Sequence, residues 1–105
     1  MKIDQSFDNR SVTIPVGETI ELSLPENPTT GYRWSIIGNG APICELKNDD
    51  FSPADQKPGA GGTRGLGFAV RKAGEVTITL RNQRKWGGAD TGNDFTLNVR
   101  AVAPN

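Results

Sequence analysis

The sequence predicts an all-β protein, a seven-stranded antiparallel β-sandwich. Apolar and polar residues alternate in run after run along the chain, which is the period-2 pattern of strands with one buried face. No window has the 3.6-residue period of an amphipathic helix, and 13 Gly with 7 Pro separate the runs as turns. Since 105 residues provide for one hydrophobic core, we expect a single domain over residues 1–105.

Six clear runs and one weaker run define the expected strands. The same-face apolar residues of the clear runs are Val12, Ile14 and Val16; Ile20, Leu22 and Leu24; Tyr32, Trp34 and Ile36; Leu66, Phe68 and Val70; Val76, Ile78 and Leu80; and Phe95, Leu97, Val99 and Ala101. The weaker run spans residues 43–51 and places Cys44 and Leu46 on one face. Seven short strands with a Trp on the third indicate an immunoglobulin-like arrangement of two sheets. Because Cys44 is the sole cysteine, Trp34 and the aliphatic residues must fill the core without a disulfide.

The charge and hydropathy of the chain argue against several kinds of partner. Lys+Arg and Asp+Glu both number 12, so no net field draws the protein to nucleic acid or to an anionic membrane. No stretch approaches the roughly 18 apolar residues of a membrane span, and the first ten residues lack the apolar run of a signal peptide. We therefore expect a soluble monomer, periplasmic or secreted if a signal peptide has been removed and otherwise cytoplasmic.

The chain contains no histidine, which removes the commonest general base and the commonest metal ligand together. Hydrolases of the Ser-His or Cys-His type are excluded, and the acidic residues are scattered along the chain. We expect no enzymatic activity, no cofactor and no metal. Cys44 permits an intermolecular disulfide.

The connections between the expected strands fall into two sets. If successive strands run in opposite directions, alternate connections meet at the same end of the sandwich. One set is short, at residues 16–17, 38–42 and 72–74, and the other is long, at residues 25–31, 53–62 and 85–92. Long loops gathered on a rigid scaffold are where binding residues tend to lie. The sequence therefore predicts a binding surface at one end.

Each long connection carries a motif with a binding interpretation and a purely structural one. In Asn27-Pro28-Thr29-Thr30-Gly31-Tyr32-Arg33-Trp34, proline and the short polar side chains stiffen the loop, although an ordinary turn has similar residues. Gly59-Ala60-Gly61-Gly62-Thr63 lacks the Lys-Ser/Thr of a phosphate-binding loop, and its glycines either admit close approach by another chain or form a plain hairpin. In Arg84-Lys85-Trp86, Trp86 lies beyond the alternating run and is either an exposed anchor or a cap on the core.

Together these three motifs resemble the chagasin family of cysteine-protease inhibitors. Members of that family carry an NPTTG-aromatic-x-Trp loop, a GxGG loop and an Arg-Pro-Trp loop, in this order and at similar spacing. The resemblance spans almost the whole chain. One departure is Lys85, which stands where the family usually has proline. Without this proline the third loop is expected to be less rigid or differently tilted.

The resemblance implies reversible, competitive inhibition of papain-like cysteine proteases by three loops that occlude the active-site cleft. Residues 27–31 would lie over the catalytic thiolate with Thr29 and Thr30 closest to it, residues 59–63 would line the unprimed side, and Trp86 would stack on the primed side. The residues expected to bind the protease are Asn27, Pro28, Thr29, Thr30, Gly31, Tyr32, Gly59, Ala60, Gly61, Gly62, Thr63, Arg84, Lys85 and Trp86.

Other interpretations of the same residues remain open at this point. In a carbohydrate-binding or adhesive module, Trp86 and Tyr32 would form a platform on which sugars stack. A structural immunoglobulin-like domain of a larger assembly is a third interpretation. Arg33, Arg64 and Arg84 lie beside the loops, where they either steer an acidic protease or simply face solvent.

Overall fold

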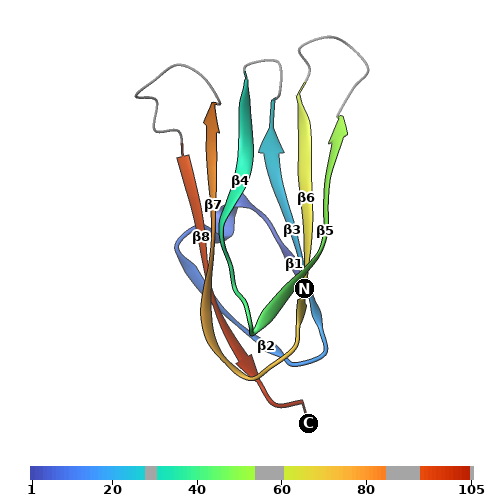
Figure 1. Ribbon diagram of the computed structural model, residues 1–105, viewed down its shortest axis with the longest axis vertical. Helices are drawn as coiled ribbons and strands as arrows, with labels where there is room; N and C mark the ends of the chain where they lie inside the picture. The colour runs from blue at the N-terminus through green and yellow to red at the C-terminus, as the bar shows by residue number, and fades with distance from the viewer. Residues whose placement is uncertain (28–30, 54–60, 85–92, 105) are drawn as a thin grey trace.

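Two four-stranded sheets pack face to face, as the computed structural model in Figure 1 shows for residues 1–27, 31–53, 61–84 and 93–104. One sheet contains, in spatial order, β1 (Lys2–Ile3), β3 (Thr19–Glu26), β6 (Gly62–Val70) and β5 (Cys44–Pro53). The other contains β2 (Arg10–Pro15), β8 (Asn93–Val102), β7 (Gly74–Arg84) and β4 (Tyr32–Asn39). A short 3-10 helix, η1 (Gln5–Phe7), joins β1 to β2. The predicted β-sandwich is confirmed.

The strand count and two pairings differ from the sequence prediction. The described residues form eight strands because the two-residue β1, too short to show any alternation, pairs with β3. The expectation of a purely antiparallel sandwich is wrong for β1 with β3 and for β2 with β8, which pair in parallel. The parallel pairing of β2 with β8 follows from the strand directions. Successive strands from β2 to β8 alternate in direction, so β2 and β8 run the same way, and they are neighbours in the sheet.

The core lies between the sheets and consists mainly of residues that the alternating runs place on one face, together with Ile3 of β1. Trp34 is 7% exposed and Phe68 is fully buried, while Val12, Val16, Ile36 and Val76 pack against the core from its margins. Cys44 is buried, but Leu46 on the same face of β5 is 36% exposed. Leu46 lies on an edge strand whose register with β6 shifts directly after it, so its side chain is covered from one side only.

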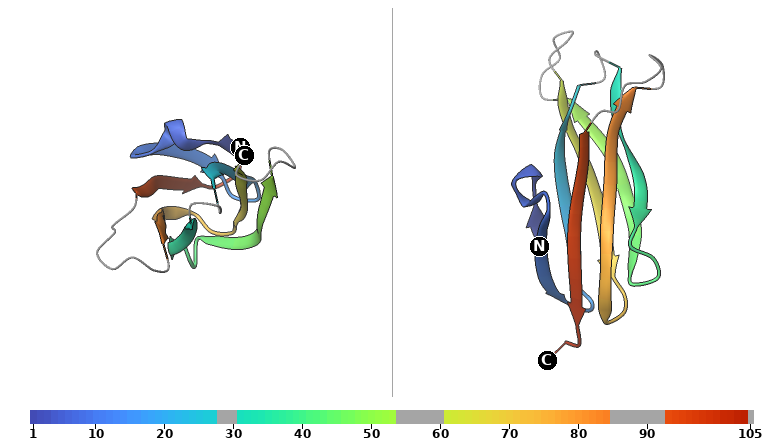
Figure 2. Two further views of the ribbon diagram at one scale, coloured as in Figure 1. Left: turned by 90° about the horizontal axis from the view of Figure 1, so that it is seen from above. Right: turned by 90° about the vertical axis from the view of Figure 1, so that its left-hand side faces the viewer.

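The strand ends that flank the three long connections lie at one end of the sandwich (Figures 1 and 2). Within one sheet, Gly62 lies between Glu26 and Pro53. Within the other, the pairing of β7 with β4 reaches Arg84 and its pairing with β8 begins at Asn82. The prediction that one end collects these connections is confirmed for the strand ends, while residues 28–30, 54–60 and 85–92 lie outside the described residues. None of the helical structure described in the chain has the length and hydropathy to cross a bilayer.

Candidate functional site

The end of the sandwich that carries the three motifs holds part of each predicted binding segment. The described residues among those expected to bind the protease are Asn27, Gly31, Tyr32, Gly61, Gly62, Thr63 and, through its main chain alone, Arg84. Pro28, Thr29, Thr30, Gly59, Ala60, Lys85 and Trp86 lie outside the described residues. The structure therefore tests how the bases of the three segments are arranged and leaves their tips as predictions.

A hollow of about 390 Å³ opens at this end between the two sheets. Its described lining residues are Pro25, Glu26, Asn27, Tyr32, Gly61, Gly62 and Asn82. The first and second motifs, which are about 30 positions apart in the sequence, thus share one hollow. The side-chain oxygen Oδ1 of Asn82 is buried there and has no hydrogen-bond partner among the residues that the structure describes.

Two glycines of the second motif are required by the fold itself. Gly61 has a φ of +68°, which only glycine adopts readily, and a Cβ there would lie 3.5 Å from Asn27. Gly62 has an ordinary φ, but a Cβ would meet the Ser52 carbonyl oxygen and lie 2.8 Å from Cζ of Phe51. The close approach of β5 therefore explains why residue 62 is glycine. This explanation holds whether or not a partner binds the main chain nearby.

A polar layer lies directly beneath this hollow and above the apolar core. The carboxylate of Glu26, whose side chain is fully buried, accepts hydrogen bonds from the main-chain N–H of Trp34 at 2.8 Å and from Nη2 of Arg64 at 2.6 Å. Nη1 of Arg64 also pairs with Asp49 at 3.2 Å, and the guanidinium lies 5.7 Å from the ring centre of Phe51. The layer joins strands of both sheets at the base of the motifs.

Arg64 is therefore a poor candidate for long-range steering of a partner. Its side chain is only 17% exposed, and the hydrogen bond to Glu26 is the main cause that raises the pKa of Arg64. Two carboxylates compensate its charge. By contrast Arg33 is exposed on β4, where the steering interpretation remains a prediction.

Sequence reasoning missed Glu26 and Asn82, although a signal for both was present. The inward positions of β3 run through Ile20, Leu22 and Leu24 to residue 26, and those of β7 run through Ile78 and Leu80 to residue 82. Continuing the period-2 count beyond the last apolar residue places both polar side chains between the sheets. A polar residue at an inward position marks the point where the core ends.

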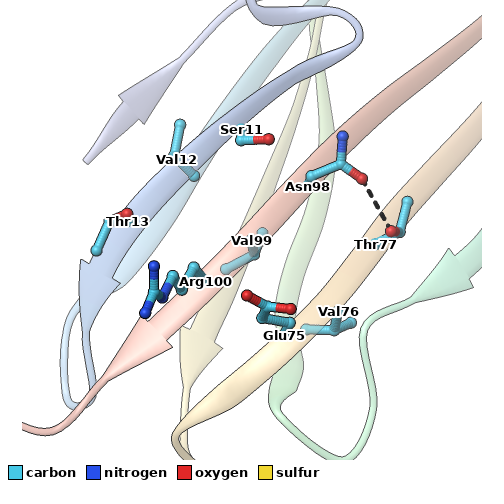
Figure 3. A pocket seen from close by; sticks show the side chains of 9 residues that line it. All are labelled: Ser11, Val12, Thr13, Glu75, Val76, Thr77, Asn98, Val99 and Arg100. Carbon is cyan, nitrogen blue, oxygen red and sulfur yellow. Dashed lines mark hydrogen bonds between the residues drawn. The ribbon is translucent and has the colours of Figure 1, made fainter.

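A second hollow, of about 490 Å³, lies on the outer face of the sheet over β2, β8 and β7 (Figure 3). Its lining residues are Ser11, Val12, Thr13, Glu75, Val76, Thr77, Asn98, Val99 and Arg100. Thr77 donates a hydrogen bond to Asn98 at 3.0 Å across the hollow's floor. None of the described motif residues lines this second hollow, whereas Asn27, Tyr32 and Gly61 line the hollow at the end of the sandwich. The end with the motifs therefore remains the candidate functional site.

The cysteine and the acidic residues give little chemistry of their own. Cys44 is 2% exposed, and burial raises the pKa of its thiol, so the intermolecular disulfide that the sequence permits has no accessible thiol to form from. Among residues 1–27, 31–53, 61–84 and 93–104, no cluster of three or more His, Cys, Asp or Glu has an arrangement that could hold a metal ion.

Two curated relatives match the chain over nearly its full length. Chagasin of Trypanosoma cruzi is 31% identical over 106 residues, which covers 95% of this chain and 96% of that protein. Amoebiasin-1 of Entamoeba histolytica is 34% identical over 104 residues, which covers 94% of this chain and 97% of that protein.

Solved structures agree with the sandwich described above. The cysteine protease inhibitor EhICP2 of Entamoeba histolytica superposes with a TM-score of 0.81 at 24% identity, covering 96% of this chain and 93% of that one. PbICP-C, solved in complex with falcipain-2, superposes with a TM-score of 0.68 at 17% identity, covering 97% of this chain and 90% of that one. At these identities the likeness supports the fold.

The family assignment rests on a family-wide comparison together with the two relatives. The family described as "Chagasin family peptidase inhibitor I42" matches residues 13–99, which include all three motifs. This agrees with inhibition, not with the carbohydrate-binding alternative or with an enzyme. The chain belongs to the chagasin family of peptidase inhibitors and is an inhibitor of cysteine proteases.

Proposed function

We propose that this chain inhibits papain-like cysteine proteases reversibly and competitively, by inserting residues 27–31, 59–63 and 84–86 into the active-site cleft. The observation that carries this proposal is the strand register. It brings the ends of β3 and β4, of β5 and β6, and of β7 and β8, which flank these three segments, to one end of a rigid sandwich. A partner that meets this end meets all three segments at once.

Each segment has a chemical role suited to its residues. The segment from Asn27 to Gly31 covers the catalytic thiolate without presenting a peptide carbonyl in attack geometry, so no covalent bond forms. The glycine-rich segment pairs its main chain with the edge of the cleft, as an extended substrate does. Trp86 stacks on apolar surface on the primed side, in the manner of an interface anchor.

The scaffold favours tight binding by a small domain because it lowers the cost of ordering the loops on binding. Ordering a side chain at an interface costs about 0.5–1.5 kcal/mol, so loops that are stiff before binding lose less of the interaction energy. Both ends of the first segment continue directly into long paired strands, at Glu26 and at Tyr32. An interface of about 1,600 Å² can then reach nanomolar affinity.

Titration of papain with this protein, using a fluorogenic peptide substrate, tests the proposal. Papain activity falls in proportion to added protein until the two are equimolar and then stays near zero, while trypsin under the same conditions keeps its activity. Full papain activity at a tenfold molar excess of the protein would refute the proposal. So would equal loss of trypsin activity, because that would indicate a nonspecific effect.

A further inference from the structure

The carboxylate of Glu26 connects three segments of the chain at the base of the binding end. Its Oε2 accepts the main-chain N–H of Trp34 at 2.8 Å and Nε of Arg64 at 3.2 Å, and its Oε1 accepts Nη2 of Arg64 at 2.6 Å. Both oxygens are thus used, in a two-point contact with one guanidinium. Because a planar guanidinium and a carboxylate that share two hydrogen bonds fix each other's orientation, this contact restrains angle as well as distance.

Two of the three connected residues adjoin the first two binding segments, and the third lies on β4 three residues after Gly31. Glu26 directly precedes Asn27, Trp34 ends the first motif, and Arg64 directly follows Thr63. The indole nitrogen of Trp34 adds a second link to the same place by donating to the carbonyl oxygen of Pro25 at 2.8 Å. The start of the first segment, the strand β4 that follows it and the far end of the second segment are therefore tied to one buried carboxylate.

Stability alone is a weak reason for a buried ion pair at this position. Removing two charges from water is costly, and apolar residues of similar size often serve a core as well or better. The inward positions next to this pair on β3 and β6 are the apolar Leu24 and Leu66. What the ion pair adds is a defined geometry between β3 and β6, close to the points where the two segments leave the sandwich.

We propose that Glu26 and Arg64 are positioning residues, which hold the first and second binding segments in their protease-binding arrangement before the protease arrives. This inference rests on the proposed function. Neither side chain needs to touch the protease, because each acts through the segment next to it. Loosening the pair lets the two segments move relative to each other, so the complex dissociates faster while the sandwich stays folded.

Arg64→Lys tests the inference, since it keeps the charge and loses the two-point contact. Arg71→Lys is the matched control: Arg71 pairs with Glu45 at 3.1 Å, is 52% exposed and follows β6 at the opposite end. Dissociation is measured from the recovery of papain activity after the complex is diluted into substrate. We expect Arg64→Lys to dissociate about tenfold faster, the size of one lost charge-assisted hydrogen bond, and Arg71→Lys to match the wild type.

Glu26→Gln provides a second variant of nearly the same volume. A glutamine offers one oxygen where the carboxylate offers two. In one orientation of the amide Nη2 of Arg64 loses its acceptor, and in the other the Trp34 N–H and Nε of Arg64 both lose theirs. We expect this variant also to dissociate about tenfold faster, with the folded fraction of each sample determined by thermal melting and active-site titration. The second readout is coupling: if the pair acts through the first segment, Arg64→Lys has a smaller effect on dissociation in a Thr29→Ala background.

The outcomes separate this inference from the proposed function. If the wild-type protein fails to inhibit papain, the proposed function is wrong. If the wild type inhibits and the folded Arg64→Lys and Glu26→Gln variants dissociate at the wild-type rate, the positioning role is wrong. Lower thermal stability with an unchanged dissociation rate, or fully additive effects of Arg64→Lys and Thr29→Ala, would likewise overturn it in favour of a structural role.

Discussion

The indole nitrogen Nε1 of Trp34 donates a hydrogen bond of 2.8 Å to the carbonyl oxygen of Pro25, which ties β4 of one sheet to β3 of the other. Trp34 is also 7% exposed and belongs to the hydrophobic core. One side chain therefore fills the upper core and links the two sheets by a polar contact. Tryptophan suits both roles because its ring is apolar and its single N–H points out of the ring edge.

Truncation of Trp34 tests the first of these roles. We expect Trp34→Ala to lower the free energy of unfolding by about 3–5 kcal/mol, the usual cost of removing a buried aromatic side chain. Trp34→Phe keeps much of the packing but leaves the Pro25 carbonyl without its donor, so we expect a smaller loss of about 1–3 kcal/mol. Urea denaturation measures both, and an unchanged transition midpoint in Trp34→Ala would contradict the assignment of Trp34 to the core.

Gly62 tests whether the second motif is constrained by the fold. A Cβ at Gly62 would meet the Ser52 carbonyl oxygen and lie 2.8 Å from Phe51, against a main chain that cannot move aside without shifting β5. We expect Gly62→Ala to destabilise the protein by about 1–3 kcal/mol, as overpacking usually does, and to weaken papain inhibition as well. Thermal melting and the papain titration measure the two effects.

Gly65, on the same strand, provides the control for this substitution. A Cβ there would lie 3.8 Å from the Asp50 carbonyl oxygen, which is ordinary contact, and the residue has no positive φ. Gly65→Ala should leave inhibition unchanged and keep or slightly raise the melting temperature, because alanine restricts the unfolded chain. Equal stability of the two alanine variants would show that β5 does not approach Gly62 as closely as described.

Cys44 gives the unfolding free energy a dependence on alkaline pH. Burial raises the pKa of its thiol, whereas in the unfolded chain the pKa is about 8.5. Above that pH the unfolded chain releases the thiol proton and the folded chain keeps it, so deprotonation favours the unfolded chain. The free energy of unfolding is therefore unaffected by ionisation of Cys44 below about pH 8.5 and decreases as the pH rises towards the folded pKa. We expect urea midpoints between pH 7 and 10 to fall more steeply for the wild type than for Cys44→Ala, and parallel curves would contradict this.

The alternating runs predicted most of the fold because burial on one face imposes its period on the sequence. Each clear run, such as Ile20 to Leu24, corresponds to a strand, and nearly all of the apolar residues in these runs face the core. The pairing of β2 with β8 could not be predicted in this way, since alternation identifies a strand and its buried face but not its neighbour. Two residues are too few to show a period, and for that reason β1 was missed.

The candidate site was predictable to the extent that its motifs are contiguous in sequence. Gly61 and Asn27 belong to different motifs, and the register of β3 with β6 places them side by side. The division of the connections into a short and a long set had predicted that these motifs share one end of the sandwich. The Glu26–Arg64 pair was not predicted, because the two residues are 38 positions apart and each is charged. A single charged residue at a strand end usually faces solvent, so its partner had to be seen in space.

Trp86 lies outside the described residues, and its role as an anchor is a prediction from the sequence. Interface tryptophans commonly contribute 2 kcal/mol or more, which is about thirtyfold in an inhibition constant. We expect Trp86→Ala to weaken papain inhibition by at least about tenfold with little change in melting temperature. A lowered melting temperature with unchanged inhibition per folded molecule would instead make Trp86 a cap on the core.

Intact-mass spectrometry after prolonged incubation with equimolar papain tests most directly whether the binding end blocks the protease without being used as a substrate. The account predicts that the protein keeps its full mass, that papain stays inhibited throughout, and that full activity returns on dilution into excess substrate. Cleavage within residues 25–32, accompanied by recovery of activity at constant concentration, would contradict it and would identify the chain as a slowly hydrolysed substrate.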